Sequence, residues 1–147
     1  MLKLPCKPLD THAKLPEYGT EGAACFDFYA RIPFGSWVSL AHGERASIGT
    51  GIAVAVPEGY VLYLFSRSGH GAKHGVRLGN CVGVIDSDYR GEIKLIITND
   101  GQDTFEVHDG ERFAQGMLMP YPKVVVAWTA ELPATKRGAG GLGSTGR

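Results

Sequence analysis

Short segments in which apolar residues alternate with polar ones, each followed by a turn, recur along this chain and restrict its possible folds. Residues 25–30 and 91–97 are such segments, and at residues 60–65 β-branched and aromatic side chains occupy both faces, which suits a strand buried on both sides. This pattern predicts strands. The 21 Gly and 8 Pro residues are spread along the whole length, which nearly excludes a fully helical protein.

Turn-forming residues separate the predicted strands at an even spacing. Pro57-Glu-Gly59 follows a further predicted strand at residues 52–56, and Asn99-Asp-Gly101 is typical of a tight hairpin. Two more strands are predicted at residues 113–119 and 123–129. Many short strands at regular intervals predict an all-β sandwich, jelly roll or barrel.

One short helix and one break in composition complete the expected architecture. The only helix candidate is a turn or two near residues 68–74, and the glycines within and after it keep it short. A Gly-rich segment begins after Pro133. We therefore expect an all-β jelly roll or distorted β-barrel as a single domain, residues 1–133, followed by a flexible tail, residues 134–147.

Length, charge and cysteine content argue against several classes of protein. The 147 residues suit one domain, and no apolar run approaches the ~20 residues of a transmembrane helix. The first residues lack the apolar core of a signal peptide, so secretion is not expected. A net charge of zero does not favour general nucleic-acid binding. Three cysteines without CxxC spacing favour reduced thiols and a cytoplasmic location.

The balanced net charge hides an uneven distribution. Residues 1–135 carry 12 basic and 15 acidic groups, a net charge of −3, whereas the last 12 residues carry +3 through Lys136, Arg137 and Arg147. A basic tail on a mildly acidic body predicts a small anionic ligand or an acidic partner surface.

The tail resembles two nucleotide-binding loops without matching either. Residues 138–143 fit GxGxxG, but dinucleotide binding also requires a preceding strand, a following helix and a later acidic residue. A Walker A loop requires a lysine where Ser144 stands. Consecutive Gly N–H groups with Arg137, Ser144 and Thr145 can still wrap a phosphate chain. The alternative is a disordered polar tail. Ordering ten residues costs roughly 10 kcal/mol at ~1 kcal/mol each, so we expect order only around a ligand.

A three-residue segment after a predicted strand is a candidate phosphate site. Arg67-Ser-Gly69 follows the strand at residues 60–65 and enters the predicted helical turn. A helix N-terminus, a hydroxyl, a small residue and a guanidinium together can bind phosphate. The alternative is an N-cap serine beside an exposed arginine.

A polar cluster interrupts the apolar stretch at residues 79–92: Asp86, Asp88, Tyr89, Arg90 and Glu92. In an extended chain, Asp86 and Asp88 share one face and Tyr89 lies on the other. A carboxylate held there can accept a proton from water as a general base. The alternative is a turn in which Asp88 and Arg90 form a structural ion pair.

The other polar candidates are single residues or pairs. Gln115 lies within an apolar predicted strand, where an amide is most often structural. His70 and His74 have the spacing of helical zinc ligands, but Gly71 replaces the expected Glu and glycines break the segment, so a zinc site is disfavoured. The remaining histidines are isolated and are expected at the surface: His12, His42 and His108.

Five segments resemble, in order and spacing, the motifs of the trimeric deoxyuridine triphosphate nucleotidohydrolases (dUTPases). They cover the chain from about residue 20 to its end, and the third and fifth are the most specific: residues 24–30, 66–75, 83–92, 110–115 and 137–146. The resemblance implies a jelly-roll homotrimer that hydrolyses dUTP to dUMP and pyrophosphate with Mg2+. It also implies sites shared between three subunits, with neither direct nucleic-acid binding nor a membrane partner.

The resemblance implies a role for each matching residue. Asp86 matches the general base that deprotonates the water attacking the α-phosphorus. Tyr89 matches the residue packed under the deoxyribose, where it would exclude a 2′-hydroxyl. Asp27 matches an acid in the outer shell of Mg2+, which the triphosphate itself holds because a hard cation prefers oxygen ligands. The other matches are substrate contacts: Asn80, Gly83, Val84 and Ile85 at the uracil; Arg67, Ser68, Gly69 and Gln115 at the phosphates; Lys94 near the site; and Arg137, Leu142, Ser144 and Thr145 in the closing tail.

Three positions depart from the family pattern. Leu142 replaces the usual Phe that stacks on uracil, His70-Gly71 replaces Leu-Ala, and Cys25 replaces Gly. None of these three departures touches the proposed base or the phosphate contacts. We therefore expect them to change the affinity for the nucleotide more than the activity.

Two other functions remain alternatives. The related deoxycytidine triphosphate deaminases share the fold and release ammonia instead, and a non-enzymatic ligand-sensing role would retain the same site. The five motifs with their Arg137 tail argue against the deaminase, and the full catalytic set argues against a purely non-enzymatic role.

Overall fold

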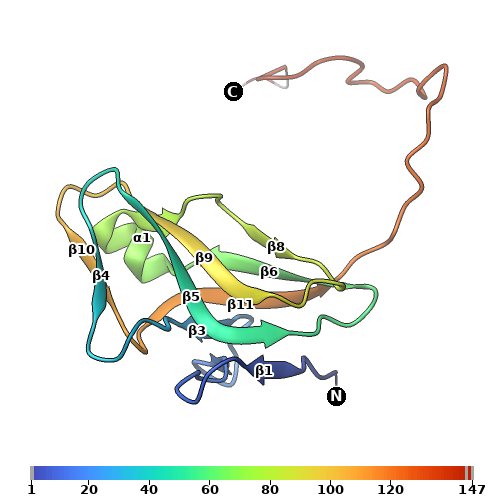
Figure 1. Cartoon of the computed structure of the whole chain (residues 1–147). Coiled ribbons are helices and arrows are strands. Elements are labelled where there is room, and N and C mark those ends of the chain that lie inside the picture. Colours follow the sequence, from blue (N-terminus) through green and yellow to red (C-terminus); the bar gives the residue numbers. More distant parts are fainter. Residues whose placement is uncertain (1, 145, 147) are drawn as a thin grey trace.

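The computed structural model describes residues 2–144 and 146, and its regular structure is almost entirely β (Figure 1). The elements follow the chain as β1 (Cys6–Pro8), β2 (Glu17–Tyr18), β3 (Phe26–Tyr29), β4 (Trp37–Leu40), β5 (Arg45–Val54), β6 (Tyr60–Ser66), α1 (Ser68–His74), β7 (Val76–Leu78), β8 (Gly83–Ile85), β9 (Glu92–Asn99), β10 (Phe105–His108) and β11 (Arg112–Pro120). The predicted helix is confirmed as α1. No helix in the described part of the chain is long and apolar enough to cross a membrane.

The strands form three antiparallel sheets. One has the order β1-β5-β9-β7, the second β2-β3-β11-β6-β8, and the third pairs β10 with β4. Neighbours in each sheet are mostly distant in sequence, as in a jelly roll. The predicted all-β architecture is therefore confirmed, and so are the strands expected at residues 25–30, 60–65, 91–97 and 113–119.

Strand β9 illustrates how alternation builds the core. Ile93, Leu95 and Ile97 are at most 2% exposed, whereas Lys94 and Ile96 point outward. Each fully buried side chain of this size contributes ~1.5–3 kcal/mol to stability. One buried cluster joins the two large sheets, with Ile48, Ile93 and Leu95 from one and Phe28, Leu62 and Leu64 from the other.

Both predicted turns exist, but the Asn99-Gly101 turn does not close a hairpin. Strand β9 ends there, and β10 pairs with β4 rather than with β9. Asn99 is fully buried, and its side-chain amide donates to the carbonyl oxygens of Leu40 and Asp103, both at 2.8 Å. The long-range bond to Leu40 and the local bond to Asp103 fix the chain where it passes from one sheet to another. The turn at residues 57–59, closed by a 3.1 Å hydrogen bond, likewise leads from β5 to β6 in the other sheet.

The strand predicted at residues 123–129 is wrong for the single chain. The chain leaves the barrel at the end of β11 (Figure 1), and no helix or strand follows between residues 121 and 144. Val125, Val126 and Trp128 are 94%, 92% and 103% exposed. An apolar run becomes a strand only when a neighbouring strand completes its hydrogen bonds, and no strand among residues 2–144 and 146 does so.

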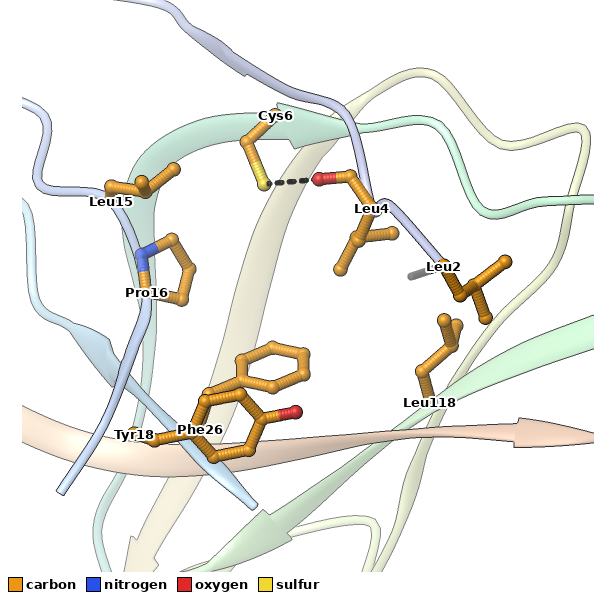
Figure 2. A pocket seen from close by; sticks show the side chains of 8 residues that line it. All are labelled: Leu2, Leu4, Cys6, Leu15, Pro16, Tyr18, Phe26 and Leu118. Carbon is orange, nitrogen blue, oxygen red and sulfur yellow. Dashed lines mark hydrogen bonds between the residues drawn. The ribbon is translucent and has the colours of Figure 1, made fainter. Parts of the chain in front are cut away.

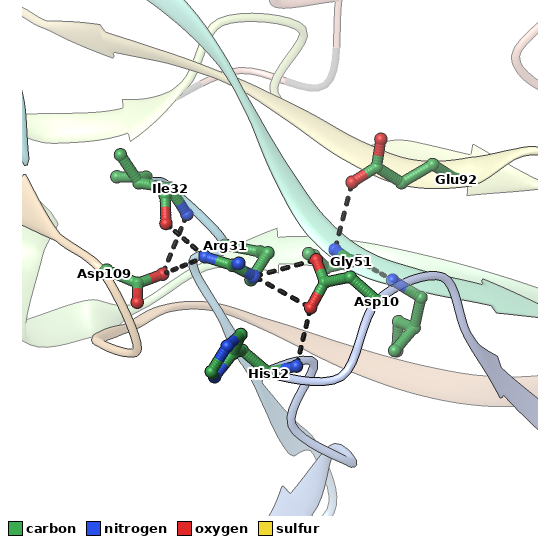
Figure 3. A network of polar contacts seen from close by, with 9 residues as sticks. Asp10, His12, Arg31, Ile32, Gly51, Glu92 and Asp109 are labelled. Carbon is green, nitrogen blue, oxygen red and sulfur yellow. Dashed lines mark hydrogen bonds and ion pairs between the residues drawn. The ribbon is translucent and has the colours of Figure 1, made fainter. Parts of the chain in front are cut away.

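A polar network fixes the N-terminal segment against a bulge in β5 (Figure 3). Arg31 lies between Asp10 and Asp109, with its nitrogens 2.8 and 3.2 Å from their carboxylate oxygens. The hydrogen bond from Arg31 lowers the pKa of Asp10. Behind this network, β5 shifts register between Gly49 and Ala53. Its Gly51 takes a left-handed φ of 67° and turns its N–H toward Glu92.

Candidate active site

A hollow of about 260 Å3 opens where β8 ends and β9 begins. Its lining comprises Val84, Ile85, Asp86, Tyr89, Glu92 and Lys94. All except Glu92 are predicted site residues. The volume lies just below the ~300–1,000 Å3 that is typical of ligand pockets. The hollow in the single chain is therefore small for a ligand of nucleotide size.

The loop between the two strands curls so that Asp86 and Tyr89 face the same hollow. The N–H of Tyr89 donates to the carbonyl oxygen of Asp86 at 3.3 Å. Arg90 donates to the carbonyl oxygens of Ser87 and Tyr89, at 2.7 and 2.8 Å. The prediction that Asp86 and Asp88 share one face, with Tyr89 on the other, is therefore wrong. Asp88 lines a different hollow, because this segment turns instead of running extended.

The guanidinium of Arg90 stabilises the loop, but not through the ion pair with Asp88 that the sequence offered as an alternative. It binds loop carbonyl oxygens instead of the carboxylate of Asp88. The carboxylates of Asp86 and Asp88 are consequently not committed to Arg90, and both residues are exposed.

The side chain of Glu92 links the hollow to the bulge of β5. Its carboxylate accepts the N–H of Gly51 at 3.0 Å and lies 3.4 Å from the Nζ of Lys94. Glu92 therefore fixes the start of β9 and orients Lys94. Glu92 belongs to the polar cluster at residues 79–92 but was not a predicted site residue. Only the register of β5 against β9 reveals its position.

A second group of predicted residues lies where β3, β11 and β6 run side by side. Gln115 in β11 stands opposite Asp27 in β3 and Phe65 in β6. The amide of Gln115 donates to the carbonyl oxygen of Ser66 at 3.1 Å. Cross-strand pairing thus brings together residues that are up to 88 positions apart in the sequence.

Two guanidinium groups hold the carboxylate of Asp27. The Nε of Arg67 lies 3.2 Å from one oxygen, and the Nη1 of Arg112 lies 3.2 Å from the other. Arg112 was not among the predicted site residues, although its basic charge within the segment 110–115 was a usable signal. Two guanidinium groups against one carboxylate leave these three side chains with a net charge of +1, which suits an anionic ligand such as phosphate.

The helix α1 begins one residue earlier than an N-cap serine would require. Arg67 is the N-cap, in an extended conformation, and Ser68 is the first helical residue. The serine hydroxyl therefore does not cap the helix, and Ser68 and Gly69 are exposed. The backbone N–H groups of a first helical turn lack helical partners and can bind an anion.

The other predicted residues lie near the hollow or in the tail. Asn80 is exposed in the turn between β7 and β8. Gly83 is buried, and a Cβ there would lie 2.9 Å from the Cβ of Leu64, so its role in the single chain is close strand packing. The tail residues Arg137, Leu142 and Ser144 are exposed. Thr145 lies outside the described residues.

The two groups of site residues lie toward opposite ends of β6. Ile85 pairs with Leu62 at one level of the sheet, and Arg67 is five residues further along. At ~3.3 Å per residue, this separation is about 17 Å.

The residues of the chain suit Mg2+ only in its outer shell. Among residues 2–144 and 146, no group of three or more His, Cys, Asp or Glu side chains is arranged to hold a metal ion. The carboxylate of Asp27 is engaged by two guanidinium groups, which favours contact with a metal through water. Mg2+ would then take its inner ligands from phosphate oxygens.

The two histidines of α1 pack against Phe105 instead of forming a ligand pair. Each ring centroid lies 5.2 Å from that of Phe105. His70 also lies 3.7 Å from a carboxylate oxygen of Glu111. Burial lowers the pKa of His70, and the charges of Arg67 and His74 lower it further against the opposing effect of Glu111. The other three histidines are exposed, as predicted.

Replacing His70 with Leu is expected to make the protein less sensitive to acid. Because folding lowers the pKa of His70, the unfolded chain binds its proton more readily. Native stability is then lost as the pH falls through the unfolded His value of about 6.5. In thermal melts, the melting temperature should fall more between pH 7.5 and pH 5 for the wild type than for His70→Leu. Equal drops would mean that His70 does not contribute.

Comparisons with known proteins agree on one family. The dUTPase family model matches residues 11–146. A deoxyuridine 5'-triphosphate nucleotidohydrolase of Nautilia profundicola is 42% identical over 146 residues, which cover 99% of this chain and 100% of that protein. The protein of the same name from Rhizobium rhizogenes is 44% identical over 132 residues, 90% of this chain and 85% of that one. A Staphylococcus bacteriophage 80alpha dUTPase solved with dUPNHPP superposes over both full chains with a TM-score of 0.89 at 27% identity.

Proposed function

Because this chain belongs to the dUTPase family, we propose that it hydrolyses dUTP to dUMP and pyrophosphate with Asp86 as the general base. The observation that carries this proposal is one hollow that collects Asp86 and Tyr89 from the third segment of resemblance, residues 83–92, together with Lys94 from β9. The product dUMP would supply thymidylate synthesis, and removal of dUTP would keep uracil out of DNA.

The proposed chemistry begins with a water molecule at Asp86. The exposed carboxylate accepts a proton from this water, which attacks the α-phosphorus. The ring of Tyr89 lies under the deoxyribose and leaves no room for a 2′-hydroxyl. Asn80 and the strand at residues 83–85 read the uracil edge through hydrogen bonds. Such an edge-reading site discriminates strongly against cytosine, because the wrong base leaves buried polar groups unpaired.

The phosphates are bound at the other end of the sheet. Arg67, Ser68, Gly69 and Gln115 contact them, and the guanidinium of Arg67 is already oriented by Asp27. Positive charge at this point stabilises the pyrophosphate as it gains negative charge. When it is bound to the triphosphate, Mg2+ would neutralise part of the phosphate charge, with Asp27 contacting it through water.

Assembly into a homotrimer would solve the separation of the two groups of site residues. An Asp86 hollow from one subunit can meet an Arg67 group from a neighbour, although the two lie about 17 Å apart within a chain at ~3.3 Å per residue. The exposed run at residues 124–128 also needs a partner. A second uncovered apolar surface is a groove of about 350 Å3 (Figure 2), lined by Leu2, Leu4, Cys6, Leu15, Pro16, Tyr18, Phe26 and Leu118.

The tail and the cellular location are parts of the same proposal. Residues 134–147 close over the bound nucleotide, with Arg137, Ser144 and Thr145 on the β- and γ-phosphates and Leu142 on the base, while residues 1–133 form the domain. The three unpaired thiols of Cys6, Cys25 and Cys81 suit the reducing cytoplasm.

A panel of nucleotides tests the proposed activity directly. The protein is incubated with Mg2+ and dUTP, dCTP, dTTP or UTP, and the release of pyrophosphate and of ammonia is measured. We expect pyrophosphate from dUTP alone at an appreciable rate. Ammonia from dCTP would identify a deaminase instead, and the absence of any turnover would favour a ligand-sensing role.

Mixing two inactive variants tests the shared site. Asp86→Asn removes the base and Arg67→Gln removes a phosphate contact, and the two chains are unfolded and refolded together in equal amounts. If different subunits supply the two residues, random assembly restores activity to about a quarter of the sites. Each variant refolded alone is the control. A mixture no more active than its components would place the whole site within one chain.

A further inference from the structure

Gly91 lies directly against the ring of Tyr89. A Cβ on residue 91 would lie 2.6 Å from the Cζ and 3.0 Å from the Cε2 of Tyr89, and closer still to its hydroxyl oxygen. These separations are shorter than van der Waals contact. Gly91 is not among the glycines with a positive φ, so its backbone conformation is open to alanine. The obstacle to a side chain at residue 91 is the Tyr89 ring.

Hydrogen bonds fix the backbone of the loop that surrounds the Tyr89 ring. The hydroxyl of Tyr89 donates to the carbonyl oxygen of Glu92 at 3.0 Å, and Arg90 binds the carbonyl oxygen of Tyr89 at 2.8 Å. Glu92 is itself anchored to Gly51 by a 3.0 Å hydrogen bond. Because the loop is held at these points, a side chain at residue 91 would displace the ring rather than the strand.

The ring is also the part of Tyr89 that faces the ligand. Tyr89 is 44% exposed and lines the hollow together with Asp86. A shift of the ring therefore changes the shape of the hollow where the sugar would lie. The carboxylate of Asp86 is not part of the contact with Gly91.

We propose that Gly91 determines the sugar specificity of the site as a positioning residue for Tyr89, because its missing side chain lets the phenol ring lie against the loop. This inference rests on the proposed dUTP hydrolysis. It separates two properties of the site: the proton transfer depends on Asp86, whereas the rejection of a 2′-hydroxyl depends on the space above Gly91.

A double-mutant cycle tests the inference. The kcat/KM values for dUTP and UTP are measured for the wild type, Gly91→Ala, Tyr89→Ala and the double variant. We expect Gly91→Ala to lower the dUTP to UTP preference about tenfold or more, in line with the effect of one misplaced group in a binding pocket. In the Tyr89→Ala background, the same change should alter the preference less than about twofold, because the obstructing ring is absent.

Gly22→Ala is the matched control, since a Cβ at residue 22 would meet nothing within 4 Å, and its preference should equal that of the wild type. An unchanged preference in Gly91→Ala, or the same loss in both backgrounds, would overturn the inference. A wild type without preference for dUTP over UTP would instead overturn the proposed function.

Circular dichroism melts cover the case in which Gly91→Ala does not fold. If the clash is with the ring alone, the double variant with Tyr89→Ala should fold although the single variant does not. Failure of Gly91→Ala to fold in both backgrounds would make Gly91 a determinant of the fold, contrary to the inference.

Discussion

Replacing Asp86 with Asn is expected to lower the rate of dUTP hydrolysis by about 10²–10⁴-fold, the usual effect of losing a general base. The amide keeps the shape of the side chain but cannot take the proton from water. Asp86 is exposed in its hollow, so folding and dUTP binding should be preserved. Steady-state rates, a titration with dUTP and a thermal melt measure the three properties separately.

Asp88 provides a matched control for this substitution. It lies two residues away in the same loop but lines a different hollow. Asp88→Asn should therefore retain most of the activity. An Asp86→Asn variant with more than about a tenth of the wild-type rate would show that another group is the base.

Ending the chain at Thr135 is expected to have the second largest effect. The truncation removes Arg137, the glycines, Ser144 and Thr145 but no strand. The described hydrogen bonds of Arg137 and Ser144 stay within the tail, from Arg137 Nε to Gly140 O and from Ser144 N to Gly141 O. The melting temperature should therefore change little. Hydrolysis should fall by about 10²–10³-fold, because closure excludes water and brings positive charge to the leaving group.

Leu142→Phe should change the activity in the opposite direction to the truncation. A ring that stacks on the base would stabilise the closed state by roughly 1 kcal/mol.

Normal hydrolysis by the truncated chain would mean that the tail is a dispensable end. Loss of folding on truncation would mean that the boundary between domain and tail lies further along the chain.

Local patterns along the chain were sufficient to predict the helix and the strands β3, β6, β9 and β11, whereas β1, β2, β4, β7, β8 and β10 were not predicted. Runs rich in apolar, β-branched and aromatic residues identified the predicted strands, and closely spaced glycines limited the helix to Ser68–His74. The connections were not predictable in the same way. Asn99 looks like a hairpin residue, but its amide binds Leu40, which is 59 positions away. A turn motif does not encode such a distant partner.

The same distinction applies to the site. The polar cluster around Asp86 was visible because charged residues interrupted an apolar stretch. The contribution of Arg112 appears only when β3 and β11 pair and bring it to Asp27. The apolar run at residues 124–128 predicted a strand that is not formed, since composition alone does not reveal whether another strand is available to pair with it.

The distance between the two ends of β6 has a consequence for how activity depends on protein concentration. If each chain carries one part of each of two different active sites, a newly made or diluted chain that has not assembled has no activity. Activity then rises with a higher than first power of concentration until assembly saturates. The rate of dUTP hydrolysis in a cell would then rise steeply above a threshold concentration of the protein, rather than in proportion to the amount synthesised.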